Sequence, residues 1–308
     1  MSITQIKTER REEWRELRKG YIGGSDAAAC VGLNPYKSAF SLWAEKTGRT
    51  PEFEGNLATE TGAFLEDFVA AKFCEVTGKK VRRNNRSIVN DEYPWAIANV
   101  DREIVGEDAG LECKTTSELN MRRFKDGEYP ANYYVQCVHY MAVTGKKKWY
   151  LAVLVGNREF LWFEIERDED EIAALMAAEK SLYEYIQSNT APETDGSRST
   201  GDALASIYPS ETEGFTVDLT GFIAALDERK ALCDSIKTLE GRRDEIDNQL
   251  KAFMGEAEGG ACEGYKVSWK TSERRTFDSK AYMKDHADGD YEPYYKTASA
   301  RTFRVSVK

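Results

Sequence analysis

The chain has 308 residues, of which 41% are hydrophobic and 11% aromatic, so it is long and apolar enough to fold around a substantial core. It carries 53 acidic and 43 basic residues, and its net charge of -10 argues against a protein that coats nucleic acid indiscriminately. No apolar run reaches the roughly 18 residues of a membrane span, and the N-terminal segment is too charged for a secretory signal. We therefore expect a cytoplasmic protein with no membrane contact.

The six cysteines are scattered singly, and the histidines are His139 and His286 alone. No cysteine pair has zinc-site spacing, so we expect reduced thiols, and any metal should be held by oxygen ligands. We expect a structural role for His139 and assign no functional role to His286. Basic residues gather in several short segments, which fits either solvated surfaces or a local positive groove.

The first half of the chain alternates helical and strand-like patterns. A charged amphipathic helix is expected to end near Gly20, and a second helix follows with Ser25 or Asp26 in capping position. Apolar residues recur at helical spacing over residues 56–77, and the glycine that follows stops this helix. The pattern places Glu66 on the long helix.

Five strand-like runs are expected, at residues 79–89, 95–105, 109–116, 148–155 and 159–165. Turn-prone segments separate the first three, which predicts an antiparallel meander. Helices are expected over residues 132–143 and 168–187. Five strands flanked by helices describe an α/β or α+β domain with a central mixed sheet, occupying residues 1–187.

The remainder of the chain is expected to form three further parts. Residues 188–214 are rich in Ser, Thr, Gly and Pro, which predicts a linker or exposed loop. Residues 215–258 show four-three apolar spacing over about four heptads, which predicts a long coiled-coil-like helix. Its stripe could pack on a partner chain, the tail module or the body, and we expect packing on its own chain. Residues 259–308 should form a small α+β module with strands in "YKVSWK" and "RTFRVSV".

The segment "GLECKTTSEL", residues 110–119, holds the most informative pattern. Because side chains alternate along a strand, Glu112 and Lys114 should project from one face and Cys113 into the core. A short hairpin through residues 106–110 would bring Asp101 near Glu112 at one end of the sheet. These residues form D-x10-E-x-K, the arrangement of PD-(D/E)xK phosphodiesterases. Taken alone the pattern is weak, because acid-rich sequences generate it often.

The residue types suit metal-assisted phosphodiester hydrolysis. Mg²⁺ prefers carboxylates, water and phosphate oxygens in near-octahedral geometry, and it helps to ionise a bound water. Lys114 beside the carboxylates would hold that water and neutralise charge on the nonbridging phosphate oxygens. The backbone carbonyl of Cys113 is a further candidate ligand.

Several longer motifs occur in a fixed order: "EWRELRKGYIGGSDAAACVGLNPYKSAFSLWAEKTG", "TGAFLEDFVAAKF", "WAIANVDREI", "GLECKTT" and "YYVQCVHYMAVTGKKKWYLAVL". Together they resemble the YqaJ-like viral recombinase family and the related lambda-type exonucleases, over about residues 13–187. The resemblance implies a restriction-endonuclease-like PD-(D/E)xK fold and a Mg²⁺-dependent 5′-to-3′ exonuclease on linear double-stranded DNA. The 3′ single strand left behind would serve a RecT/Beta-like annealing protein in phage-type recombination. The resemblance also implies two metal ions per site, with Mn²⁺ as a substitute, and a homo-oligomer, a trimeric ring being one form.

The resemblance also implies roles for individual residues. Asp101 and Glu112 match the metal ligands, with Glu66 completing the site, and Lys114 matches the catalytic lysine. Gln136, in "YVQCVHY", matches the glutamine that contacts the scissile region. Each of these residues also has a structural alternative, such as an ion pair between Glu112 and Lys114.

A second group of residues is implied to bind the 5′ phosphate. Arg18 and Ser25, in "RKGYIGGSDAA", match the pair that holds this phosphate, and a guanidinium suits a phosphate dianion. Two positions before Asp101 the family favours a small hydroxyl residue, and Asn99 stands there. Val100 replaces the usual proline. A structure-specific or nicking endonuclease of the same fold, and a catalytically weak recombination scaffold, remain alternatives.

Overall fold

The structure is a computed structural model that describes residues 2–8, 11–297 and 301–306. The chain divides into two compact units, Met1–Pro209 and Ser210–Lys308. Within the described ranges, no helix combines the length and apolar character needed to cross a bilayer.

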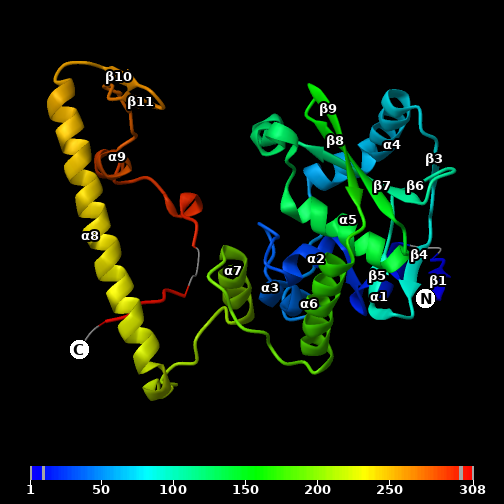
Figure 1. The fold of residues 1–308 in the computed structure, drawn as a ribbon. Coiled ribbons are helices and arrows are strands. Elements are labelled where there is room, and N and C mark those ends of the chain that lie inside the picture. Colours follow the sequence, from blue (N-terminus) through cyan, green and yellow to red (C-terminus); the bar gives the residue numbers. More distant parts are fainter. Residues whose placement is uncertain (1, 9–10, 298–300, 307–308) are drawn as a thin grey trace. The chain divides into compact units, whose positions relative to one another are not determined.

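The larger sheet of the first unit is mixed and five-stranded (Figure 1). Its strands, in spatial order, are β3 (Val81–Arg83), β6 (Arg102–Ile104), β7 (Ala109–Thr116), β8 (Lys148–Val155) and β9 (Glu159–Glu166). Strands β7 and β8 are parallel, and the other neighbours are antiparallel. The expected central mixed sheet of five strands flanked by helices is confirmed.

A smaller sheet lies beside it, with the order β1-β4-β5-β2. Its strands are β1 (Ile3–Ile6), β4 (Ser87–Asn90), β5 (Tyr93–Ala98) and β2 (Ile22–Gly23). The runs expected to be single strands at 79–89 and 95–105 are therefore each divided between two sheets, so the single meander was wrong. Asparagine side chains explain the breaks, because Asn84 Oδ1 accepts the N–H of Arg86 at 3.2 Å and Asn99 Oδ1 accepts two side-chain hydrogen bonds.

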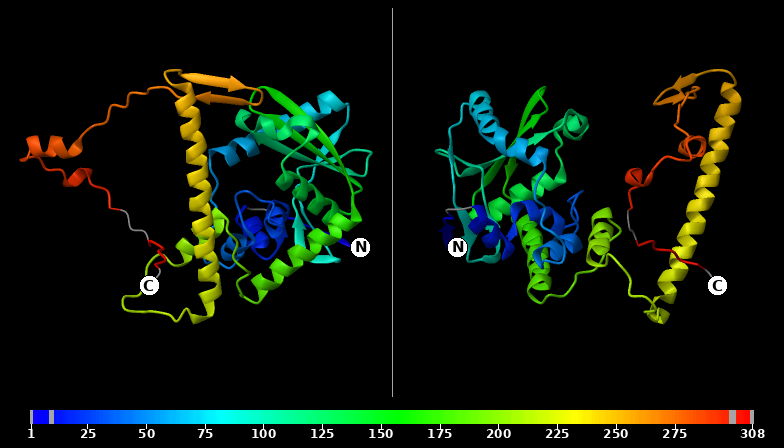
Figure 2. Two further views of the ribbon diagram at one scale, coloured as in Figure 1. Left: turned by 60° about the vertical axis from the view of Figure 1, so that its left-hand side comes forward. Right: turned by 180° about the vertical axis from the view of Figure 1, so that it is seen from behind.

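Helices cover both faces of the larger sheet (Figure 2). Helix α4 (Leu57–Thr77) begins at the cap Asn56 and ends at Gly78, whose φ of 71° favours glycine, and it packs on β7 and β8. Helix α5 (Ala131–Thr144) packs on the other face of β8 and on β4 and β5. Alternation along β8 separates two core clusters, with Trp149 and Leu151 on the α5 side and Tyr150 and Ala152 on the α4 side.

The remaining helices of this unit are α1 (Arg11–Lys19), α2 (Gly24–Cys30), α3 (Ala39–Lys46) and α6 (Glu169–Gln187), with a 3₁₀ segment, η1, at Glu118–Gly127. Neither Ser25 nor Asp26 is the N-cap residue of α2, contrary to expectation, although Asp26 takes part in the capping box. The cap is Gly23, and Asp26 lies three residues further on, where its carboxylate accepts the N–H of Gly23 at 3.2 Å.

The segment 188–214 is not only a linker, because it contains helix α7 (Arg198–Ile207), which packs on α3. Ser197 caps the helix, and Thr200 bonds Ser38 through their hydroxyl oxygens at 2.8 Å. Ala203 is buried in the contact. The Ser- and Thr-rich composition that predicted a loop supplies the cap and the hydrogen bonds of this helix instead.

The second unit contains a long helix, α8 (Ile223–Met254), preceded by a 3₁₀ turn, η2 (Thr220–Phe222). A hairpin of β10 (Gly259–Cys262) and β11 (Tyr265–Ser268) follows, then α9 (Ser279–Asp285) and η3 (Glu292–Tyr294). The strand expected in "RTFRVSV" is absent over residues 301–306, and the last residue of that run lies outside the described residues.

Candidate active site

Strand β7 places the acid and base of the E-x-K pattern side by side. Lys114 Nζ lies 2.6 Å from Glu112 Oε1, and both side chains are on the face covered by α5. Cys113 packs in the cluster on the opposite face. Burial alone would lower the pKa of Lys114, but the adjacent Glu112 carboxylate raises it, so the lysine is a firmly held cation.

Helix α5 supplies a third member of this group. Gln136 accepts a hydrogen bond from Lys114 Nζ at 2.8 Å through Oε1, and its Nε2 donates to Glu112 Oε1 at 2.8 Å. The same Nε2 donates to the hydroxyl of Tyr140 at 2.9 Å. Gln136 therefore joins the acid and the base in one closed triangle and fixes their orientation.

Asp101 lies where the chain passes between the two sheets. Its Oδ2 accepts the N–H of Cys113 at 2.8 Å, which brings it beside β7 as the hairpin argument predicts. Burial raises the pKa of Asp101 well above its usual range, and the negative charges of Glu112 and Glu66 raise it further. Mutual repulsion among three acids is the electrostatic environment that a cation relieves.

Glu66 approaches from the other side of the sheet, on α4. Its Oε1 accepts a 2.5 Å hydrogen bond from Arg102 Nη1, and the same arginine pairs with Asp67. Within the described part of the chain, no three Asp, Glu, His or Cys side chains stand close enough to hold one metal ion. The ion pair with Arg102 holds Glu66 apart from Glu112.

The residues nevertheless fit a hard cation. Glu112 is 3% exposed, and its Oε2 is buried without any hydrogen-bond partner among the described residues. A buried carboxylate oxygen with no partner is costly, and a divalent ion would satisfy it. With Asp101 it would give an all-oxygen donor set of the kind that Mg²⁺ prefers.

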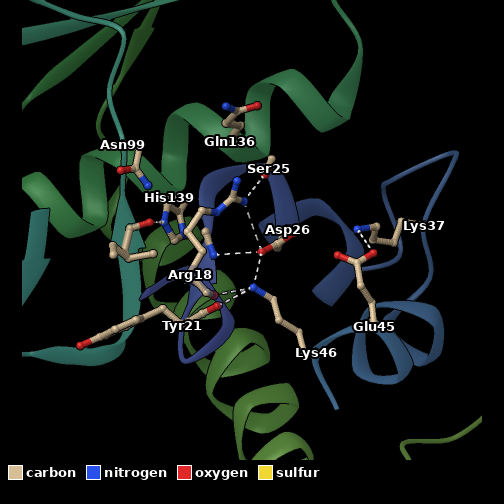
Figure 3. Close-up of polar contacts among 12 residues, drawn as sticks. Arg18, Tyr21, Ser25, Asp26, Lys37, Glu45, Lys46, Asn99, Gln136 and His139 are labelled. Carbon is tan, nitrogen blue, oxygen red and sulfur yellow. Dashed lines mark hydrogen bonds and ion pairs between the residues drawn. The ribbon is translucent and has the colours of Figure 1, made fainter. Parts of the chain in front are cut away.

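A second cluster surrounds Arg18 at the end of α1 (Figure 3). Arg18 Nη2 donates to Ser25 Oγ at 2.8 Å and lies 3.7 Å from Asp26 Oδ2. Gly23 gives the guanidinium room, because a Cβ there would lie 3.1 Å from Nη2. A cavity of about 350 Å³ opens here, lined by Arg18, Ser25 and several charged side chains. The structure thus brings Arg18 and Ser25 together.

A buried ion pair supports this cluster. Asp26 is 5% exposed, and Lys46 Nζ lies 3.0 Å from its Oδ2. Lys46 also donates to the carbonyls of Arg18 and Tyr21, at 2.8 and 2.7 Å (Figure 3). Burial would raise the pKa of Asp26, but the charges of Lys46, Arg18 and Lys37 outweigh burial and lower it to about 2.

Trp14 connects the two clusters. It lines the Arg18 cavity and also a second cavity of about 380 Å³, whose walls include Asn99, Asp101 and Glu66. Its indole N–H donates to Asn99 Oδ1 at 3.0 Å, and the Arg18 guanidinium lies 4.8 Å from its ring centre. Asn99 therefore takes part in the wall between the cavities.

His139 does not face either cavity. It is fully buried, with Nδ1 2.8 Å from Glu179 Oε1 and Nε2 3.0 Å from the carbonyl of Ile97. Because a carbonyl only accepts, Nε2 carries a proton. Burial alone would lower the pKa of His139, but Glu179 raises it. The pair connects α5, α6 and β5, which is a structural arrangement.

Sequence reasoning did not identify Asp26, Lys46, Arg102 or Trp14 as parts of these clusters. The position of Asp26 at the start of a helix predicts a cap and not an ion pair. Nothing in the sequence signals that Arg102 pairs with Glu66 and Asp67 of α4. Lys46 and Trp14 lie within the longest of the five motifs that resemble the family. That motif was the one available sign of their involvement.

The sequence model of the YqaJ-like viral recombinase domain matches residues 13–147. The Bacillus subtilis (strain 168) protein YqaJ is 39% identical over 303 residues, which are 96% of this chain and 94% of that protein. The chain belongs to the YqaJ-like viral recombinase family.

Shorter or more distant similarities exist as well. Protein D345L of African swine fever virus (strain Badajoz 1971 Vero-adapted) is 33% identical over 72 residues, which are 22% of this chain and 21% of that protein. The crystal structure of LHK-Exo of Laribacter hongkongensis with dAMP superposes with a TM-score of 0.49 at 21% identity, over 58% of this chain and 93% of that one.

Proposed function

We propose that this protein is a Mg²⁺-dependent 5′-to-3′ exonuclease that acts on linear double-stranded DNA during phage-type recombination. One observation carries the proposal: the cavity that Asp101 lines and the Arg18 cavity share Trp14 as a wall, and the hydrogen bond of Asp101 to Cys113 N–H places this acid beside Glu112 and Lys114. A hydrolytic centre next to a cavity that contains Arg18 and Ser25 suits an enzyme that recognises an end. Membership of a viral recombinase family supports a role in recombination.

Asp101, Glu112 and the carbonyl of Cys113 would hold the metal, with Glu66 joining them once it leaves Arg102. A second ion would use the same acids, and Mn²⁺ would substitute for Mg²⁺. The bound metal would polarise the phosphorus and assist ionisation of the attacking water. This chemistry needs the carboxylates to be ionised, and the metal's charge would offset the repulsion that raises the pKa of Asp101.

Lys114 would orient the attacking water and neutralise charge that develops on the nonbridging oxygens. Gln136 fixes the ammonium through its 2.8 Å hydrogen bond, so the lysine does not need to reorganise during the reaction. Attack at phosphorus breaks the bond to O3′ of the terminal nucleotide. The shortened strand then ends in a new 5′ phosphate, which suits the Arg18 cavity again.

Arg18 and Ser25 would bind the terminal 5′ phosphate, with Asn99 in the adjoining wall. We further propose that the protein works in the cytoplasm as a homo-oligomer, a trimeric ring being one form, and passes its 3′ tails to a RecT/Beta-like annealing protein.

The first test uses end-labelled linear duplexes with a 5′ phosphate or a 5′ hydroxyl, and a closed circular duplex, each with Mg²⁺ or EDTA. We expect Mg²⁺-dependent release of mononucleotides from phosphorylated ends, with circles intact. Cutting of circles would assign the protein to the endonucleases. Inactivity on every substrate would favour a scaffold.

Substitution of the proposed centre gives a sharper test. Lys114→Ala and Asp101→Asn should each lower the rate at saturating DNA by at least about 100-fold, since both act on the reacting groups. Duplex binding, followed by anisotropy in EDTA, should persist. Lys180→Ala, which removes an exposed lysine of α6, is the matched control. Undiminished digestion by either variant would exclude this centre.

A further inference from the structure

We propose that Lys46 is a positioning residue that neutralises Asp26 and thereby leaves the Arg18 guanidinium available to a terminal phosphate of DNA. The inference rests on the proposed function, because it takes the Arg18 cavity as the site of a 5′ phosphate. It adds a role for two residues, Lys46 and Asp26, that need not touch the DNA.

The charges around the cavity are paired unequally. Lys37 Nζ lies 2.7 Å from Glu45, and Lys19 Nζ lies 2.6 Å from Glu16. Lys46 lies 3.0 Å from Asp26, whereas Arg18 lies 3.7 Å from the same carboxylate oxygen. Among these cations, Arg18 alone has an acidic partner that lies closer to another cation, because Asp26 is nearer to Lys46 than to Arg18. Its positive charge is therefore the least neutralised.

The guanidinium also has unused hydrogen-bonding capacity. Arg18 Nε is buried and makes no hydrogen bond among the described residues, and Nη2 donates to the neutral hydroxyl of Ser25. A phosphate accepts from arginine N–H groups, so the Nη2 side of the guanidinium, whose present partner is a neutral hydroxyl, is the edge that a phosphate would use. Lys46 keeps the Asp26 carboxylate from taking that edge.

Removal of Lys46 would reverse this arrangement. Asp26 is 5% exposed and cannot turn to water, so without Lys46 the carboxylate has Arg18 as its cation within 4 Å. A close arginine–carboxylate pair would form and occupy the phosphate-binding edge. The carboxylate would also repel an incoming phosphate in a partly desolvated cavity.

Lys46 has a second effect on the same side chain. Its hydrogen bonds to the carbonyls of Arg18 and Tyr21 fix the main chain that follows α1 (Figure 3). A purely structural role would act through these carbonyls alone. The two roles separate in a double variant, because removal of the Asp26 charge cannot restore hydrogen bonds to carbonyls.

The experiment measures the dissociation constants of duplexes with a 5′ phosphate and a 5′ hydroxyl, by anisotropy in EDTA, where no cleavage occurs. The readout is the ratio of the two constants. Lys46→Met should reduce the wild-type preference for the phosphate by about 10-fold, which corresponds to about 1.4 kcal/mol. Asp26→Asn combined with Lys46→Met should restore the ratio to within about threefold of wild type. Lys180→Met, an exposed lysine on α6, is the control for loss of one charge.

An unchanged ratio in Lys46→Met, or a double variant as poor as the single one, would overturn the inference. If Lys46→Met does not fold, Asp26→Asn alone decides: its ratio should stay within about threefold of wild type, and loss of the preference would refute the role given to Lys46. Wild-type protein that binds both ends equally would overturn the phosphate site itself. The failure of the proposed function is thus seen in the wild type, and that of the inference in the variants.

Discussion

Asp101 lowers the stability of the metal-free protein, because its proposed role as a metal ligand places a carboxylate among other acids. The carboxylate is buried, and Glu112 and Glu66 raise its pKa beyond the effect of burial. Such a group favours its protonated form in the folded state. When the pH rises above the ordinary pKa of an aspartate, this carboxyl loses its proton in the unfolded state but keeps it in the folded state. The free energy of unfolding therefore falls as the pH rises.

Asp101→Asn should therefore stabilise the metal-free protein. The difference in unfolding free energy should be near zero at about pH 4 and grow with pH to about 1 kcal/mol or more, since each unit of raised pKa is worth about 1.4 kcal/mol. An asparagine oxygen can still accept the N–H of Cys113. Thermal unfolding in EDTA at pH 5 and pH 8.5 would measure this, with the exposed Asp91→Asn as control. A variant less stable than wild type at pH 8.5 would contradict the assigned repulsion.

For single residues, the sequence predicts those side-chain positions that follow from the alternation of side chains along a strand. Glu112 and Lys114 lie side by side because a strand places alternate residues on one face, and this needs no tertiary information. Asp26 could not be predicted in the same way. Its burial and its ion pair with Lys46 depend on how α2 and α3 meet. Short-range patterns assign such an acid to a helix cap.

Among the elements, the contact of α2 with α5 determines how the two clusters are placed. A Cβ on Gly24 would lie 2.5 Å from the ring of Tyr140, so only glycine allows this approach. Tyr140 in turn accepts a hydrogen bond from Gln136. Ser25 follows Gly24 directly, and therefore a single close contact links the Arg18 cavity to the group of Glu112, Lys114 and Gln136.

Gly24→Ala should displace α2 from α5. We expect a loss of about 1–3 kcal/mol in unfolding free energy, the usual effect of overpacking, and a weaker preference for 5′-phosphorylated ends. Gly20→Ala is the matched control, because its Cβ would meet only the carbonyl oxygen of Leu17 at 3.8 Å. Equal melting temperatures for the two variants would show that the helices can separate without cost.

The limits of prediction are also clear for the strands. Runs 79–89 and 95–105 have the composition of strands along their length, and their antiparallel neighbours were found correctly. The division of run 95–105 between two sheets depends on Asn99, which accepts hydrogen bonds from Trp14 and Ser87. Since Trp14 lies 85 residues away in the sequence, no local pattern could reveal the break.

On the scale of the whole molecule, α8 stands out because none of its described side chains is buried. Its core-type positions are Ala225, Arg229, Leu232, Ile236, Leu239, Arg243, Ile246, Leu250 and Phe253. A strict repeat of seven residues fits a supercoiled partner helix better than a globular surface, which would follow the 3.6-residue period. This supports the proposed homo-oligomer, with α8 of a second copy as the partner.

Leu239→Glu should then weaken self-association of the full chain. A charge at a central core position of a coiled coil is buried without a partner, so we expect at least a 10-fold rise in the dissociation constant. Thr238→Glu, on the outer face of the same turn, should have little effect. Sedimentation equilibrium would compare the two, with circular dichroism to verify the helix. Identical association of both variants would exclude α8 from the interface.

The passage between the two sheets has a mechanical consequence. Glu112 and Lys114 belong to a strand that pairs with β8 along its whole length, whereas Asp101 lies where the chain leaves the ladder with β6. One side of the centre is therefore stiff and the other compliant. Asp101, on the compliant side, can adjust its distance to an ion without disturbing the sheet. Amide hydrogen exchange should accordingly be faster at residues 99–101 than at 111–114. Exchange at residues 99–101 should slow when a cation binds.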